Sequence, residues 1–166
     1  MRIFPLRTVA LLGSLAAAAA LAVAHVTEIW GGHPPCPLCL WERWPYRVAL
    51  VLGLLGALLP TRYTRALVVA ILLTFAADAA IATIHVGVEF GYWPSPLPSC
   101  SAPKIRAGAS IAERLAAMPA RPDKPCDEPT FLIPGLPLSM AAMNLIYALS
   151  VTALLAVLLF RSPRRP

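Results

Sequence analysis

Charged residues are scarce in this chain of 166 residues, at 13% of the total, about half the usual share of a soluble domain. The sequence also lacks glycine-rich tracts, glutamine-rich tracts and internal repeats. It therefore cannot supply the polar surface that a soluble protein of this size needs. It is instead 58% hydrophobic, with a mean hydropathy of +0.70, which favours one compact domain that has lipid as its solvent.

Four long apolar runs predict membrane-spanning helices, at about 9–29, 41–59, 66–84 and 138–160. Each comes close to the roughly 20 residues that cross a bilayer. The second run reaches this length if its helix starts near Trp41, which puts Pro45 in the first turn, where a missing N–H costs little. The expected fold is an all-α membrane protein, an antiparallel four-helix transmembrane bundle.

Basic residues indicate which side of the membrane each segment faces. The N-terminus with Arg2 and Arg7, the basic turn at 61–65 and the segment at 161–166 hold seven of the fourteen basic residues and none of the eight acids. The positive-inside rule makes this side cytoplasmic, with both termini. The loops at about 30–40 and 85–137 then face the opposite compartment. The net charge of +6 follows this membrane pattern, so no nucleic-acid partner is expected.

The N-terminal segment allows a second interpretation. Arg2 and Arg7, an alanine-rich stretch and Ala22-Val23-Ala24 resemble a signal peptide with its cleavage site. The apolar core before that site is slightly long for a signal peptide, so we expect an uncleaved helix. Cleavage would leave three spans and would move no cysteine to the other side of the membrane.

The long loop is rich in proline, which predicts irregular, extended backbone. One stretch of it, at 108–118, differs. Ser110 can act as the N-cap of a helix, and Glu113 stands where a capping box needs its partner. A short helix is therefore predicted inside the loop.

All four cysteines lie in the two loops, in two pairs of different kinds. Cys36 and Cys39 form a C-x-x-C at the mouth of the second span, an arrangement that lowers a thiol pKa and favours thiolate exchange. Cys100 and Cys126 stand in proline-rich stretches of a loop that can open and reach another protein. The alternative is a non-enzymatic membrane scaffold with structural disulfides. For Cys36–Cys39 this is weak, because such a short bridge stabilises little.

Metal binding is a further alternative. His33, Cys36 and Cys39 have plausible ligand spacing, and the other two thiols could complete a site. An oxidising compartment disfavours free thiolates, so no metal ligand is predicted.

The segment at 36–47, CPLCLWERWPYR, resembles the C-x-x-C-x-x-x-R signature of the disulfide bond formation protein B (DsbB) family. The stretch at 85–100, HVGVEFGYWPSPLPSC, is similar to the family's segment before its third cysteine. The order of the pairs and the four-span layout extend the resemblance over essentially the whole chain. The vitamin K epoxide reductase family joins similar chemistry to a similar bundle, but there the loop pair precedes the C-x-x-C.

The resemblance implies a thiol:quinone oxidoreductase of the bacterial inner membrane, with both cysteine loops in the periplasm. Its partner would be a periplasmic thioredoxin-fold thiol oxidase (DsbA-like), and its acceptor a membrane quinone, ubiquinone first and menaquinone as the alternative. By position, the partner attacks Cys100, Cys126 then attacks Cys36, and Cys39 is freed beside the quinone. We expect resting disulfides Cys36–Cys39 and Cys100–Cys126.

Two further residues are assigned to the quinone site. Arg43 matches the family's quinone-site arginine and lies one helical turn from Cys39; its guanidinium can donate to a reduced quinone oxygen and stabilise a thiolate. The alternative is an arginine that snorkels to the interface. His85 is predicted to help bind the quinone or to relay protons, with an interfacial pair formed with Glu89 as the alternative.

Other polar and aromatic residues have simpler expectations. Glu42 is expected to pair with Arg43 or Arg47, or to face solvent. Asp78, inside the third span, is either functional or bonded to a neighbouring helix. Contact with a quinone ring is the alternative for Trp41 or Trp44. Most of the aromatic residues near the loops are expected to be interfacial anchors: Trp41, Trp44, Tyr46, Tyr92 and Trp93.

Overall fold

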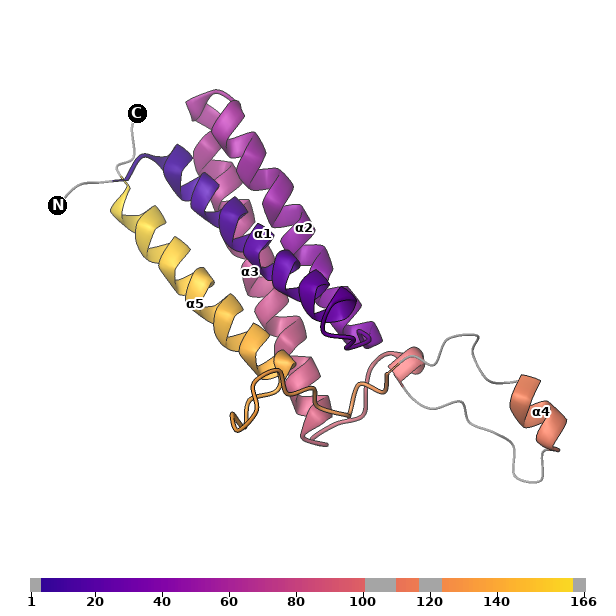
Figure 1. The fold of residues 1–166 in the computed structure, drawn as a ribbon. Helices are drawn as coiled ribbons and strands as arrows, with labels where there is room; N and C mark the ends of the chain where they lie inside the picture. Colours follow the sequence, from indigo (N-terminus) through magenta and orange to yellow (C-terminus); the bar gives the residue numbers. More distant parts are fainter. Residues whose placement is uncertain (1–3, 101–109, 117–123, 163–166) are drawn as a thin grey trace.

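The computed structural model describes residues 4–100, 110–116 and 124–162, and regular structure there is helical except for one isolated bridge between Phe131 and Ser139. The elements are α1 (Leu6–Ile29), α2 (Pro37–Leu58), α3 (Thr61–Glu89), the 3-10 turn η1 (Pro98–Cys100), α4 (Ile111–Ala116) and α5 (Met140–Arg161). α1, α2, α3 and α5 run side by side (Figure 1). The α2–α3 turn lies at one end of this group, and η1 lies at the other.

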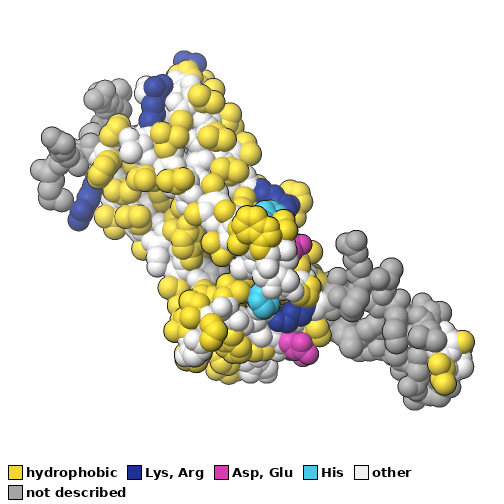
Figure 2. All heavy atoms as spheres, viewed as in Figure 1, with side chains coloured by type: hydrophobic (Ala, Val, Ile, Leu, Met, Phe, Trp, Pro, Cys, Tyr) yellow, Lys and Arg dark blue, Asp and Glu magenta, His cyan; other side chains and the backbone are white. Residues whose placement is uncertain are grey.

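The all-helical prediction is confirmed, and three of the predicted spans coincide with helices long and apolar enough to cross a membrane: α1, α3 and α5. α2 has 22 residues, which is length enough, but its first half carries three charged residues, Glu42, Arg43 and Arg47. On the face seen in Figure 2, hydrophobic side chains cover most of the helix length, and charged side chains gather toward the ends.

The predicted basic turn at 61–65 is wrong, because these residues form the first turns of α3. Pro60 stands at the N-cap with an extended backbone, so the chain reverses direction at Leu59 and Pro60 alone. At its other end α3 continues to Glu89, beyond the predicted 66–84. Because both ends of α3 contain polar residues, the apolar run in the sequence does not show where the helix begins and ends.

Small residues let α1 and α2 approach closely. A Cβ atom added at Gly53 would lie 2.5 Å from the Cβ of Ser14 and 2.7 Å from the carbonyl oxygen of Ala10. A Cβ added at Gly56 would lie 2.8 Å from the Cβ of Ala10. Ser14 also donates a hydrogen bond to the carbonyl oxygen of Leu50 across this interface, at 3.0 Å. Close backbone approach of this kind is how helices associate where lipid removes the hydrophobic driving force.

Gly53→Val is expected to push α1 away from α2 and to destabilise the protein, because overpacking a close contact costs about 1–3 kcal/mol. Thermal unfolding of the detergent-purified protein measures the effect as a lower midpoint. Leu54→Val is the matched control, since it introduces the same side chain one residue further along, where Leu54 is exposed on the outer face of α2. Equal midpoints for the two variants would contradict the close packing.

A buried polar network joins α2, α3 and α5 within the bundle. Asp78 is fully buried, and Asn144 Nδ2 donates to its Oδ2 at 3.2 Å. Tyr46 donates to Asn144 Oδ1 at 2.7 Å. Asp78 therefore bonds a neighbouring helix, which was one of its two expected roles. The expectation that Tyr46 is an interfacial anchor is wrong, because its side chain points into the core and is only 4% exposed.

The short helix α4 begins after Ser110. The backbone N–H and the hydroxyl of Ser110 donate to the Glu113 carboxylate at 2.8 and 3.0 Å, and the Glu113 N–H donates to Ser110 Oγ at 3.2 Å. These hydrogen bonds lower the pKa of Glu113. The predicted capping box is confirmed, and residues 108–109 and 117–118 of the predicted helix lie outside the described residues.

Candidate redox site

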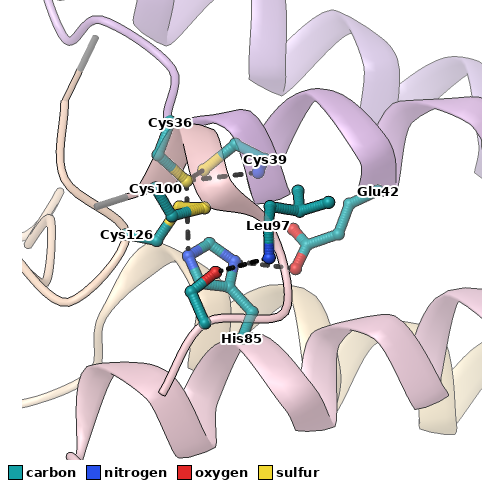
Figure 3. The surroundings of a disulfide bond; sticks show 8 residues. Cys36, Cys39, Glu42, His85, Leu97, Cys100 and Cys126 are labelled. Atoms are coloured by element: carbon teal, nitrogen blue, oxygen red, sulfur yellow. Dashed lines mark hydrogen bonds and ion pairs between the residues drawn. A yellow bond between two sulfur atoms is a disulfide. The ribbon is translucent and has the colours of Figure 1, made fainter. Parts of the chain in front are cut away.

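The four cysteines meet at the end of the bundle where α2 contacts η1 (Figure 3). Cys36 is the N-cap of α2, and Cys39 lies in the first turn of that helix. Cys100 ends η1, and Cys126 lies in the loop before α5. One buried hydrophobic cluster contains them: Cys36, Leu38, Val88, Cys100 and Cys126, with Cys39 and Leu97 packed against it. Two pairs that are far apart in sequence thus share one environment.

The two pairs differ in their bonding. Cys100 and Cys126 are joined by a disulfide, as expected. Cys36 and Cys39 are thiols whose sulfur atoms lie 3.0 Å apart, which differs from the resting disulfide expected for them. Pro37, at the first position of α2, fixes φ in a helical range. The first helix turn then places Cys39 next to Cys36. Only a small movement of the two sulfur atoms is needed to form a disulfide.

Cys36 is the thiol whose anion is stabilised. Its sulfur lies 3.0 Å from the Cys39 sulfur, in a thiol–thiol hydrogen bond, and accepts a second hydrogen bond from the Cys39 backbone N–H at 3.2 Å. Both lower the pKa of Cys36, the thiol bond most, while burial acts in the opposite direction. A stabilised thiolate at a helix N-terminus is the state that takes part in disulfide exchange.

Cys39→Ala is expected to raise the pKa of Cys36 toward that of an ordinary thiol, because it removes the largest cause of the lowered value. Less thiolate is then present at pH 7, so alkylation of Cys36 becomes slower and its pH profile moves to higher pH. Iodoacetamide rates measured by mass spectrometry, in a Cys100→Ser, Cys126→Ser background, check this. An unchanged profile would show that the backbone N–H alone sets the thiolate fraction.

His85 and Glu42 form a buried pair beside Cys36. His85 Nδ1 lies 2.9 Å from Glu42 Oε1, and His85 Nε2 lies 3.4 Å from Cys36 Sγ. A carboxylate at Nδ1 favours the tautomer that leaves Nε2 as an acceptor. The expectations for Glu42 are wrong, because it faces neither solvent nor an arginine and is 7% exposed. Glu89, the alternative partner of His85, instead accepts a hydrogen bond from Ser139.

Arg43 is buried one turn beyond Cys39 and is held by α1. Its Nη1 donates to Glu28 Oε2 at 2.7 Å, and its Nη2 donates to the carbonyl oxygen of Ala24 at 3.4 Å. Its Nε is buried and has no hydrogen-bond partner among the described residues. Arg43 is therefore fixed in position by one acid and keeps one donor unused.

A cavity of about 300 Å³ opens beside Cys39 and Arg43, between α1, α2 and α5. Its wall is mainly apolar and includes Ala20, Leu21, Ala24, Met140, Met143 and Tyr147. A largely apolar pocket with a few polar groups is typical of a small-molecule site. This lining, which includes the Arg43 guanidinium group, fits a flat, apolar ring that carries an oxygen acceptor. Of the predicted site residues, Cys36, Cys39, Arg43 and His85 line the cavity, and Cys100 and Cys126 lie in the adjoining cluster.

Sequence reasoning missed Glu28, Glu42 and Tyr46 as parts of this site. For two of them a signal was present. Positions three and seven residues after Cys39 share its face of a helix, so Glu42 and Tyr46 turn toward the same cavity. Glu28 lies on another helix, and no spacing rule connects it to Arg43.

The family model for disulfide bond formation protein DsbB matches residues 6–158. An uncharacterised protein of Rickettsia prowazekii (strain Madrid E) is 30% identical over 142 residues, which cover 85% of this chain and 80% of that protein. No solved structure gives a significant match. The family match includes both cysteine loops, α1 and α3, and all of α5 except its last three residues. The chain therefore belongs to the DsbB family and is a multi-pass membrane oxidoreductase of disulfide bond formation.

Proposed function

We propose that the protein is a thiol:quinone oxidoreductase that reoxidises a periplasmic, DsbA-like thiol oxidase. The observation that carries this proposal is the packing of both cysteine pairs in one cluster, beside a cavity lined by Arg43. Ubiquinone is the proposed acceptor, with menaquinone as the alternative. In the inner membrane α2 would be the fourth span, both cysteine loops would face the periplasm, and the termini would face the cytoplasm.

Electrons would enter at the loop disulfide. A partner thiolate attacks Cys100, the Cys100–Cys126 bond breaks, and Cys126 leaves as a thiolate while a mixed disulfide forms. Cys126 then attacks Cys36 of an oxidised Cys36–Cys39 pair and releases Cys39. This exchange requires the two pairs to come together, and both pairs lie in one buried cluster.

The second half of the exchange restores the loop pair. The partner's other thiol attacks the mixed disulfide, which frees Cys100 and leaves the partner oxidised. Cys100 then attacks Cys126, reforms the loop disulfide and releases Cys36. The net change moves two electrons and two protons from the partner to Cys36 and Cys39. The observed combination, with Cys100–Cys126 bonded and Cys36 and Cys39 as thiols, corresponds to this product.

A strong acceptor is needed because a DsbA-type disulfide has a potential near −120 mV, and about 30 mV changes the equilibrium tenfold. A bound quinone supplies an acceptor for two electrons and two protons. Cys36 and Cys39 would close their disulfide as they give up the electron pair. His85 Nε2, 3.4 Å from Cys36 Sγ, would take the proton of that thiol, and Arg43 would hold the quinone oxygen.

The test is quinone reduction by the purified protein with a reduced DsbA-type partner and a short-chain ubiquinone, followed by absorbance. We expect catalytic loss of the quinone band, which stops when the partner is omitted and is abolished by Cys39→Ser. Absence of turnover with both ubiquinone and menaquinone, across several thioredoxin-fold partners, would favour the membrane scaffold with structural disulfides instead.

A further inference from the structure

The described part of the chain contains a group of three metal-ligating side chains: Cys36, Cys39 and His85, whose ligand atoms all lie within 4.8 Å of one another. They come from the N-cap and first turn of α2 and from α3 (Figure 3). His33, the histidine closest to the C-x-x-C in sequence, lines the same cavity but is not in this group.

The distances suit a tetrahedral ion. Zn–S bonds of about 2.3 Å and Zn–N bonds of about 2.0 Å imply an S···N separation of about 3.5 Å and an S···S separation of about 3.8 Å. Cys36 Sγ lies 3.4 Å from His85 Nε2 and 3.0 Å from Cys39 Sγ. The two sulfurs have to move apart, and the third pair, Cys39 and His85, lies within 4.8 Å. Cys39 is half-buried at the cavity wall, where a small rotation is possible.

The surroundings of the histidine are a second, independent observation. Histidines that bind a metal through one ring nitrogen almost always donate the other N–H to a carboxylate, a carbonyl or water. His85 Nδ1 lies 2.9 Å from the buried Glu42 carboxylate, while Nε2 faces the sulfur. With three protein ligands, the fourth coordination position of the ion faces the cavity, where a water molecule can occupy it.

We propose that the reduced Cys36–Cys39 pair binds a thiophilic divalent cation, Zn²⁺, together with His85, and that Glu42 orients this histidine. The ion displaces one proton from each of the two thiols, and no electron moves. A disulfide offers no thiolate, so the site exists only while Cys36 and Cys39 are reduced. If the proposed function holds, Zn²⁺ stops the enzyme before its electrons leave; the metal site itself does not depend on that function.

Co²⁺ titration of the full-length protein in detergent, reduced and then freed of reductant without air, tests the site. A tetrahedral thiolate site gives Co²⁺ intense visible and charge-transfer bands, which Zn²⁺ then removes. We expect saturation at one Co²⁺ per chain, and the same signal in a Cys100→Ser, Cys126→Ser variant. Glu42→Gln should weaken binding about ten- to hundredfold, and the variant that carries both Cys36→Ser and Cys39→Ser should show no bands.

His33→Ala and His85→Ala form the deciding comparison, because both histidines line the cavity. Only His85→Ala should weaken binding. Absence of the bands in the wild type, or their loss in His33→Ala alone, would overturn the proposal. Zn²⁺ inhibition of quinone reduction is measured separately. Co²⁺ bands without any quinone turnover would refute the proposed function but support the metal site. Quinone turnover without Co²⁺ bands would support the proposed function but refute the metal site.

Discussion

A variant that carries Cys39→Ser and Cys100→Ser is expected to accumulate a disulfide between Cys36 and Cys126 in most of the purified protein. Each substitution removes the present partner of one remaining cysteine. Cys36 and Cys126 belong to the same buried cluster and are 3% and 1% exposed. A disulfide requires Cα atoms about 4.4–6.8 Å apart, and a contact inside one chain acts as a high effective concentration. Efficient bonding would establish the contact on which electron transfer between the loops depends.

Peptide mapping without reductant measures this disulfide directly. The matched control carries Cys36→Ser and Cys126→Ser, which leaves Cys39 and Cys100. We expect a much lower yield of disulfide there, because Cys39 lies at the cavity wall and is only partly buried. Free thiols throughout the first variant, or disulfides between molecules in place of the internal one, would show that the two loops do not meet as described.

Apolar runs predict where the long helices lie but not where they end. The third run predicts 66–84, whereas α3 extends from Thr61 to Glu89. An apolar run marks the part of a helix that lies in lipid. The helix itself continues beyond the lipid, as long as its backbone N–H and C=O groups still form hydrogen bonds within the helix. The second run shows the same limit in another form. α2 begins at Pro37, and its charged residues Glu42 and Arg43 face inward, where His85 and Glu28 bind them.

The residues of the candidate site that belong to sequence motifs could be predicted. The cysteines, Arg43 and His85 were found through the C-x-x-C-x-x-x-R pattern and the family resemblance, and four of these six residues line one cavity. The contact of Arg43 with Glu28 could not be found in this way. It depends on the rotation of α1 against α2, which is set by the close packing of Gly53 on Ser14. Helix rotation is a property of the whole interface, and spacing within one helix does not encode it.

Arg43→Gln is expected to lower kcat/KM for quinone about a hundredfold, because removing one preorganised donor from a developing oxyanion costs about 10²–10³ in rate. Exchange between the partner and the cysteine pairs should stay unchanged, since Arg43 is not in the buried cluster of cysteines. The loss should not come from unfolding. The carboxylate that Arg43 leaves behind belongs to Glu28, whose side chain is 36% exposed and remains solvated.

Two assays separate these effects: oxidation of a stoichiometric amount of reduced partner without quinone, and steady-state quinone reduction with it. Arg43→Lys should give an intermediate rate, since an ammonium keeps the charge but cannot reach both Glu28 and the cavity with a planar fork. Arg47→Gln is the matched control, because Arg47 is exposed on the outer face of α2, 5.1 Å above the ring of Trp44. Normal quinone kinetics in Arg43→Gln, or an equal loss in Arg47→Gln, would show that Arg43 is only a structural partner of Glu28. A loss confined to Arg43→Gln, with partner oxidation intact, would assign the cavity beside Cys39 to the electron acceptor.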